Sequence, residues 1–203
     1  KLHKALGAKG TISAIIRRLV HNGLFRYFPR ARKAFRRADA LFAATPATVR
    51  GLKRHHRREA IYLPENGITE METDKPVSLD PDERLRMIWI GGLDVKRKAV
   101  GLLLDALLKV KSDQWTISWF GNGTLSEANS KKAARLNGKI NICGKVPREQ
   151  VQEAMRHSHL HIISSLGEAT TTVLFEAMAK GIPTMTLDHC GMAGGVCDRR
   201  GIK

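Results

Sequence analysis

Two glutamates, Glu168 and Glu176, stand eight positions apart, with three threonines at 170–172 between them. Residues 165–191 are predicted to form a loop, a helix, a turn at 181–183 and a short strand. Hydroxyl side chains suit a helix start, and the unpaired N–H groups there favour bound anions, phosphates above all. A carboxylate before such a helix and another inside it can accept hydrogen bonds from a ligand's hydroxyl groups. This pattern predicts a ligand with both phosphate and hydroxyl groups.

The chain from residue 85 onward alternates between apolar strands and amphipathic helices. Near-continuous apolar strands separated by helices indicate a parallel, doubly wound sheet of the α/β class. The expected strands are 85–90, 115–120, 139–143, 160–164 and 184–187, and the expected helices are 98–111, 125–136, 147–157 and one after Thr170.

The loops that follow these strands carry groups suited to a diphosphate. In a doubly wound sheet these loops meet along one edge and build the ligand site. Glycines allow the backbone to approach a ligand closely, and a run of cations can neutralise phosphates. A sugar nucleotide fits this set of groups better than a bare nucleotide. Plainer interpretations also stand, because glycine-rich strand ends are common in this fold class and a cation run can be a solvated helix start. The residues concerned are Gly91, Gly92, Lys96, Arg97, Lys98, Gly121, Asn122, Gly123 and Gly144.

Positive charge is concentrated in the first quarter of the chain. Residues 1–58 contain 16 Lys and Arg and one acid, Asp39, whereas residues 59–203 are nearly neutral at +1. Such a block suggests an anionic partner: acidic lipid headgroups, a phosphorylated acceptor or nucleic acid. The plainer interpretation is that an acidic surface that pairs with this block lies in a part of the chain that this sequence lacks. Nucleic acid is disfavoured, because the basic block carries no recognisable nucleic-acid-binding motif.

The basic segment has its own pattern of elements. Apolar residues within 11–22 share one helical face, which suits either an ordinary core-packing helix or one lying on a membrane, and Gly23 is expected to end it. A second helix is expected at 29–37, a strand at 38–44, a helix from Pro46 and a strand at 61–63. Proline and acidic residues mark 65–82 as a linker.

Metal and disulfide chemistry find little support. The three cysteines, at 143, 190 and 197, form no C-x-x-C pair, which argues against zinc or a disulfide framework and fits a reducing cytoplasm. His55 and His56 are adjacent and point apart on a helix, so we interpret them as solvated or partner-facing. The D-x-D string at 80–82 is interpreted as a turn. No run reaches the ~18 apolar residues of a membrane span.

In these residues the chain resembles the retaining glycosyltransferases of GT-B type, family 4, also called glycosyl transferases group 1. The family's E-x7-E pair is matched by Glu168 and Glu176, and its glycine-rich loop resembles Gly91–Leu93 with Lys98. Its hinge signature resembles 63–68, and the similarity runs from about residue 38 to residue 198. The other matches in the glutamate segment are Ser165, Ala177, Met178, Ala179, Gly181 and Pro183.

The resemblance implies a domain plan and roles for single residues. Residues 1–64 would end an acceptor-side domain, 65–82 would link, and 83–203 would form a truncated Rossmann-like donor domain. Glu168 would be the catalytic residue near the transferred sugar, and Glu176 would bind the donor ribose. Lys98 would hold the diphosphate, and Lys145 and Val146 would lie by the base. Further donor contacts are expected from Gly91, Gly92, Arg97, Gly121, Asn122, Thr171, Thr172, Val173 and Leu174.

The resemblance also implies an activity. We expect retaining transfer of a hexose or related sugar from a nucleotide-diphosphate sugar to a lipid-linked or polysaccharide acceptor, without cofactor or metal, in the cytoplasm at the inner membrane face. Three departures from the family stand at Ser164, Gly92 and 169–171, where the family has proline, arginine and G-F-G. They leave open the donor sugar and the alternative of a non-catalytic nucleotide-sugar-binding module. We also expect the chain to be a partial, inactive piece of the enzyme.

Overall fold

The computed structural model describes residues 2–63, 78–80, 82–168, 171–187 and 201–202. The chain divides into two compact units, Lys1–Glu65 and Asn66–Lys203, and each is described here by itself. Most of the expected linker, 65–82, lies outside the described residues.

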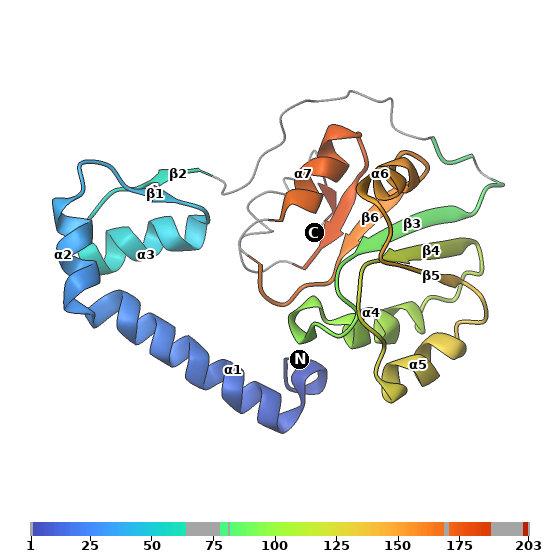
Figure 1. The fold of residues 1–203 in the computed structure, drawn as a ribbon, viewed down its shortest axis with the longest axis horizontal. Coiled ribbons are helices and arrows are strands. Elements are labelled where there is room, and N and C mark those ends of the chain that lie inside the picture. Colours follow the sequence, from blue (N-terminus) through green and yellow to red (C-terminus); the bar gives the residue numbers. More distant parts are fainter. Residues whose placement is uncertain (1, 64–77, 81, 169–170, 188–200, 203) are drawn as a thin grey trace. The chain divides into compact units, whose positions relative to one another are not determined.

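The second unit is built on a six-stranded parallel sheet (Figure 1). Its spatial order is β5-β4-β3-β6-β7-β8, so the chain starts in the middle, runs to one edge and returns to fill the other half. The direction of winding reverses between β3 and β6, which is the place where doubly wound sheets bind ligands. This order confirms the predicted α/β, Rossmann-like fold. The strands are β3 (Leu85–Ile90), β4 (Trp115–Phe120), β5 (Ile140–Gly144), β6 (Leu160–Ile163), β7 (Thr184–Thr186) and β8 (Gly201–Ile202).

Helices cover both faces of this sheet, with α4 and α5 on one side and α6 and α7 on the other (Figure 1). The sheet residues alternate accordingly. Trp89 and Trp119 are paired across β3 and β4 and pack with the α4 side chains, whereas Ile88 and Phe120 pack with α6 and α7. Both faces of β3 and β4 are therefore largely buried, which explains the mostly apolar sequences of these two strands. The helices are η1 (Lys96–Lys98), α4 (Val100–Leu107), α5 (Glu127–Ala134), α6 (Arg148–Arg156) and α7 (Thr172–Ala179).

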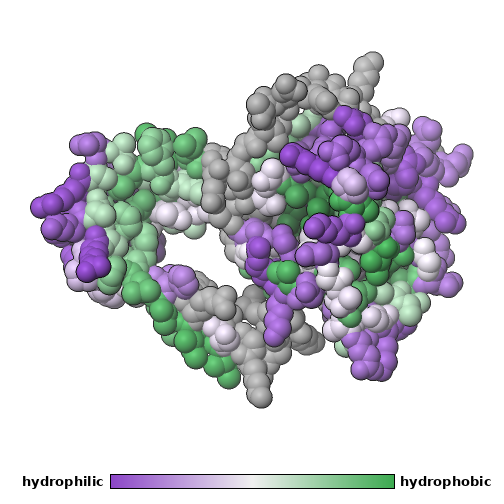
Figure 2. All heavy atoms as spheres, viewed as in Figure 1, coloured by the Kyte–Doolittle hydropathy of each residue, from purple (hydrophilic) through white to green (hydrophobic). Residues whose placement is uncertain are grey.

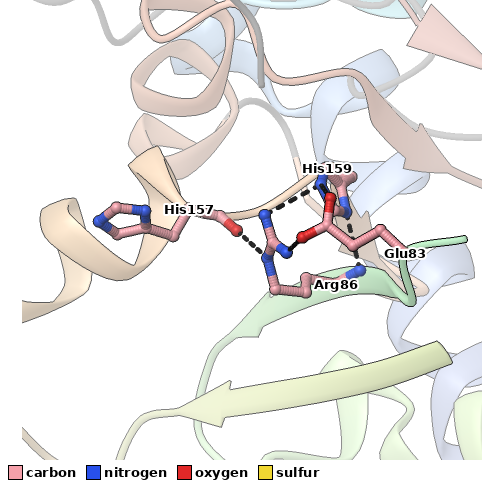
Figure 3. A network of polar contacts seen from close by, with 4 residues as sticks. All are labelled: Glu83, Arg86, His157 and His159. Atoms are coloured by element: carbon pink, nitrogen blue, oxygen red, sulfur yellow. Dashed lines mark hydrogen bonds and ion pairs between the residues drawn. The ribbon is translucent and has the colours of Figure 1, made fainter. Parts of the chain in front are cut away.

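A polar network joins β3 to β6 at the ends where these strands begin (Figure 3). The main-chain N–H of Arg86 donates to His159 Nδ1 at 2.9 Å, and its Nε donates to the His157 carbonyl at 2.7 Å. The Arg86 guanidinium also pairs with Glu83. Burial, followed by the charge of Arg86, lowers the pKa of His159. The two central strands are thus fastened at one end, and their other ends are left to the loops of the candidate site.

Within the first unit, the described residues 2–63 form three helices and one short parallel strand pair: α1 (Leu2–Tyr27), α2 (Pro29–Arg37), β1 (Phe42–Ala43), α3 (Pro46–His56) and β2 (Ile61–Tyr62). Thr45 caps α3, its Oγ1 accepting from the Thr48 N–H at 3.1 Å, and Pro46 follows as expected. Figure 2 shows apolar side chains along α1 and hydrophilic ones over α2. The α1 side chains Ile12, Ile15, Ile16, Leu19, Val20 and Leu24 are exposed.

Three expectations for the first unit are wrong. The first helix does not end at Gly23 but continues to Tyr27, because a single glycine costs a helix only about 1 kcal/mol. The expected strand 38–44 is limited to Phe42–Ala43. His56 is half-buried rather than solvated: it packs against Phe25 and Phe35, and its Nε2 lies 2.9 Å from the Phe25 carbonyl oxygen.

The expected helix 98–111 is also wrong at its start. A 3-10 turn occupies Lys96–Lys98, Ala99 adopts a left-handed conformation with φ 52°, and α4 begins only at Val100. The turn predicted at 80–82 is confirmed in its closing bond, from the Glu83 N–H to the Asp80 carbonyl at 2.9 Å. No group of three or more potential metal ligands occurs among the described residues, and none of the described helices is long and apolar enough to cross a bilayer. Cys190 and Cys197 lie outside the described residues.

Candidate functional site

The loops after β3 and β6 meet at the reversal of the sheet and bring together charged residues from distant parts of the sequence. Lys98 follows β3 and Glu168 follows β6, and these two strands are neighbours. Lys98 Nζ lies 2.6 Å from Glu168 Oε1. The predicted convergence of these loops is therefore present in the structure.

Glu168 is the centre of this cluster. Its Oε1 also pairs with Arg97 Nη1 at 2.6 Å and accepts from Ser165 Oγ at 3.3 Å. The Glu168 and Lys98 side chains are only 10% and 17% exposed, whereas Arg97 is 56% exposed. Burial raises the pKa of the Glu168 carboxyl, but Lys98 and Arg97 outweigh it and leave the pKa below its ordinary value. Glu168 is therefore a carboxylate at neutral pH.

The second carboxylate, Glu176, lies on α7 and pairs with a cation from α6. Its Oε1 is 2.6 Å from Arg148 Nη2, and the Glu176 side chain is 13% exposed. Arg148 was not among the residues predicted from the sequence. The available signal was its position, the first residue of the helix that follows the β5 loop, where a side chain can reach the same edge of the sheet. Each of the two glutamates thus pairs with at least one cation from another segment of the sheet domain.

The glycine-rich loops after β3 and β4 touch backbone to backbone. The Gly91 N–H donates to the Phe120 carbonyl at 2.9 Å. Gly121 has φ 143°, and a Cβ there would lie 2.0 Å from the Gly91 oxygen, so only glycine fits this approach. A Cβ at Gly92 would lie 2.7 Å from Val95 Cγ2. The family's arginine at this position would therefore require the loop to shift.

The remaining residues that were predicted to contact the sugar-nucleotide donor differ in the exposure of their side chains. The Asn122 side chain is exposed, and the main-chain carbonyl of Asn122 accepts from the Leu93 N–H at 2.9 Å. Lys145 is exposed, but Val146 packs against the core of the α6 and α7 side. The side chain of Val146 is thus committed to the core, and only its main chain is left for a ligand.

The start of α7 offers main-chain groups more than side chains. Thr171 is the N-cap residue, but its hydroxyl makes no capping bond, so the predicted role of the threonines as caps does not hold at this position. Thr172 is exposed, Val173 packs against the core and Leu174 is fully buried. Residues 169 and 170 lie outside the described residues.

Comparison with known proteins places this arrangement in a family. The model for glycosyl transferases group 1 matches residues 84–201, more than half of the chain. The glycosyltransferase TuaC of Bacillus subtilis (strain 168), named for teichuronic acid biosynthesis, is 27% identical over 128 residues. That alignment covers 63% of this chain and 31% of TuaC.

Solved structures with the same fold include glycosyltransferases of GT-B type. The lipopolysaccharide outer core galactosyltransferase WaaB, in its apo form, superposes with a TM-score of 0.65 at 18% identity, over 80% of this chain and 45% of WaaB. The pneumococcal O-GlcNAc transferase GtfA, in complex with UDP and GlcNAc, gives 0.57 at 17% identity, over 80% of this chain and 32% of GtfA. The chain thus spans less than half the length of these relatives. By its sequence match over the sheet domain, the chain belongs to the glycosyl transferases group 1 family.

Proposed function

We propose that the chain carries the donor half of a glycosyltransferase that moves a hexose or related sugar from a nucleotide-diphosphate sugar to an acceptor, with retention of configuration. The observation that carries the proposal is the largely buried Lys98–Glu168 ion pair at the reversal of the sheet, in a chain whose second family glutamate lies on α7. Cations for a diphosphate and carboxylates for hydroxyl groups are what a sugar nucleotide requires.

The cations have a defined task in this proposal. Lys98 and Arg97 neutralise the diphosphate as it leaves, and the N-terminal end of α7 adds its dipole. In the structure both cations pair with Glu168. Donor binding therefore exchanges one anion for another around Lys98, and Glu168 is released toward the hydroxyl groups of the sugar. Donor binding likewise separates Glu176 from Arg148, so that Glu176 accepts hydrogen bonds from the ribose.

The reaction needs no protein nucleophile in this scheme. The acceptor attacks from the face on which the diphosphate leaves, and the diphosphate takes the acceptor's proton. The protein contributes fixed charges where negative charge develops on the leaving group and holds the two substrates in place. The proposal includes no metal and no cofactor besides the donor.

The first unit supports a proposal for the acceptor side. The exposed apolar face of α1 stands in the same unit as the basic helix α2, and this combination suits the surface of an anionic membrane. The cations of α2 make no ion pair within the part of the chain that the structure describes. We propose a saccharide or lipid-linked acceptor, met in the cytoplasm at the inner membrane face through residues 1–58. The names of TuaC and WaaB, which refer to teichuronic acid and lipopolysaccharide, support an envelope polysaccharide as the product.

The test is a donor screen with the full-length protein. UDP-, GDP- and ADP-sugars are offered with lipid-linked saccharides, and sugar transfer is followed with Glu168→Ala, Glu176→Ala and the control Glu127→Ala. Glu127 is an exposed glutamate whose Lys131 pair lies far along the chain from the site, so its loss should leave transfer unchanged. Full transfer by both site variants would refute the site assignment. Donor binding without transfer by the wild type would favour a non-catalytic nucleotide-sugar-binding module.

A further inference from the structure

Ser164 is a buried side chain at the end of β6, and its hydroxyl has two partners. Trp89 Nε1 donates to Ser164 Oγ at 3.0 Å, and Oγ donates to the main-chain carbonyl of Lys98 at 2.6 Å. These directions are fixed, because an indole N–H only donates and a hydroxyl has one proton. The proton of Ser164 is thus committed to Lys98, and the side chain acts on the site through the main chain.

The carbonyl that Ser164 holds belongs to a strained junction. The 3-10 turn η1 ends at Lys98, and Ala99 follows with φ 52° and ψ 42°. A left-handed conformation costs a residue with a Cβ roughly 1 kcal/mol, and it persists only where the surroundings hold it. The Ala99 N–H donates to the Lys96 carbonyl at 3.1 Å on one side. The bond from Ser164, at the end of the neighbouring strand β6, holds the Lys98 carbonyl on the other side of the junction.

A second hydrogen bond joins the loop after β6 to η1, next to the bond from Ser164. The Leu166 N–H donates to the Arg97 carbonyl at 2.7 Å. The loop after β6 therefore binds two successive carbonyls of η1, and the side chains of those same residues, Arg97 and Lys98, both pair with Glu168 in that loop. The direction in which the Arg97 and Lys98 side chains point therefore depends on how the loop after β6 holds the main chain of these two residues.

We propose that Ser164 is a positioning residue that directs the Lys98 side chain toward the donor diphosphate, an inference that rests on the proposed function. The Lys98 stem runs over Gly91, where an added Cβ would lie 3.3 Å from Lys98 Cδ. With the main chain held by Ser164 and the stem held over Gly91, Lys98 has little freedom to turn away. A proline at position 164, as in the family segment, has no hydroxyl and cannot make this bond.

The test compares Ser164→Ala with Ser164→Thr and with the matched control Ser158→Ala. Ser158 is equally buried, and its Oγ donates to the Ala154 carbonyl at 2.7 Å at the opposite end of β6. Both alanine variants lose one buried hydroxyl and should lose comparable thermal stability. Calorimetry with inorganic pyrophosphate on the full-length protein should show about tenfold weaker binding for Ser164→Ala, the equivalent of one lost charge-assisted contact. Ser158→Ala should keep the wild-type affinity, and Ser164→Thr, which retains the hydroxyl, should restore it.

A second measurement does not depend on any donor. Titration of the Glu168 carboxyl by NMR in the ligand-free protein should give a higher pKa in Ser164→Ala, because Lys98 is no longer held against it, and no change in Ser158→Ala. The proposal is overturned if Ser164→Ala leaves both the pyrophosphate affinity and the pKa of Glu168 unchanged, or if Ser158→Ala alters them equally. A wild type that neither binds nucleoside diphosphates nor transfers sugar, but whose Glu168 pKa still responds to Ser164→Ala, would refute the proposed function alone.

Discussion

Replacing Glu168 with glutamine is expected to strengthen the binding of a free diphosphate while it weakens sugar transfer. Glu168 Oε1 lies 2.6 Å from both Lys98 Nζ and Arg97 Nη1. A diphosphate must take these cations from the carboxylate and then lie near its negative charge. Glutamine keeps an acceptor oxygen and nearly the same shape, so the fold is preserved while the competing charge is removed.

The size of the effect follows from the exposure of the partners. A hydrogen bond between charged groups contributes about twice as much as a neutral one, and bonds to charged groups contribute roughly 1.5–3 kcal/mol. The Lys98 contact is largely buried and should count in full, whereas Arg97 is 56% exposed and, as a solvated pair, adds little. The substitution should therefore release about 1 kcal/mol for pyrophosphate binding, roughly a fivefold gain in affinity.

The assay is isothermal calorimetry with inorganic pyrophosphate, together with transfer kinetics under the best donor. Pyrophosphate lacks the sugar, so it reports on the cations alone, whereas transfer also requires Glu168 on the sugar. Glu127→Gln removes the same charge from an exposed ion pair on α5 and controls for the net charge of the protein. Equal or weaker pyrophosphate binding by Glu168→Gln, or an equal gain by Glu127→Gln, would refute the exchange of anions around Lys98.

Three further predictions concern the scaffold of the site. Gly121→Ala should lower the free energy of unfolding by more than about 2 kcal/mol in chemical denaturation, because its Cβ would overlap the Gly91 carbonyl. The control Gly138→Ala, at a glycine with φ 77° and open space around it, should cost only about 1 kcal/mol. Equal losses in the two variants would refute the clash. Burial, followed by the charge of Lys98, lowers the pKa of His161 to about 3. As the pH falls, the unfolded chain therefore binds a proton at this histidine before the folded chain does. The free energy of unfolding should then decrease by roughly 1 kcal/mol per pH unit below about pH 6.5. His161→Gln should flatten this slope in urea titrations at pH 4–7, and an unchanged slope would assign it to other groups. Arg148→Gln should change thermal stability little, since Arg148 is 71% exposed, but it should alter the affinity for a nucleoside diphosphate, and identical affinities would show that the pair with Glu176 has no part in donor binding.

Much of the sheet domain could be predicted because its local sequence and its tertiary structure agree. The strands 85–90 and 115–120 have the predicted bounds, since each apolar run is buried on both faces and is ended by glycine. The α3 start at Thr45-Pro46 was predictable for a similar reason, because the cap is made within four residues of sequence.

Other features could not be predicted because their partners are distant in the sequence. Alanine and lysine favour helix, so nothing local marks Ala99 as the left-handed break before α4. That break is held by Ser164, 66 positions away from the Lys98 carbonyl that it binds. The pairing of Arg148 with Glu176 spans 28 positions, and the packing of His56 between Phe25 and Phe35 joins three helices.

The sequence by itself determined the class of the sheet, the family and the pair of glutamates, because apolar periodicity and motif spacing are local properties. Only the tertiary structure decided how the charges are distributed around that pair. Where the β3 and β6 loops meet, Lys98 and Arg97 lie on one oxygen of Glu168 and keep it ionised despite its burial, whereas Glu176 pairs with Arg148. The physical reason is that the Coulomb attraction between two charges is stronger where less water surrounds them. Which groups are shielded from water together depends on the packing of segments that are distant in the sequence.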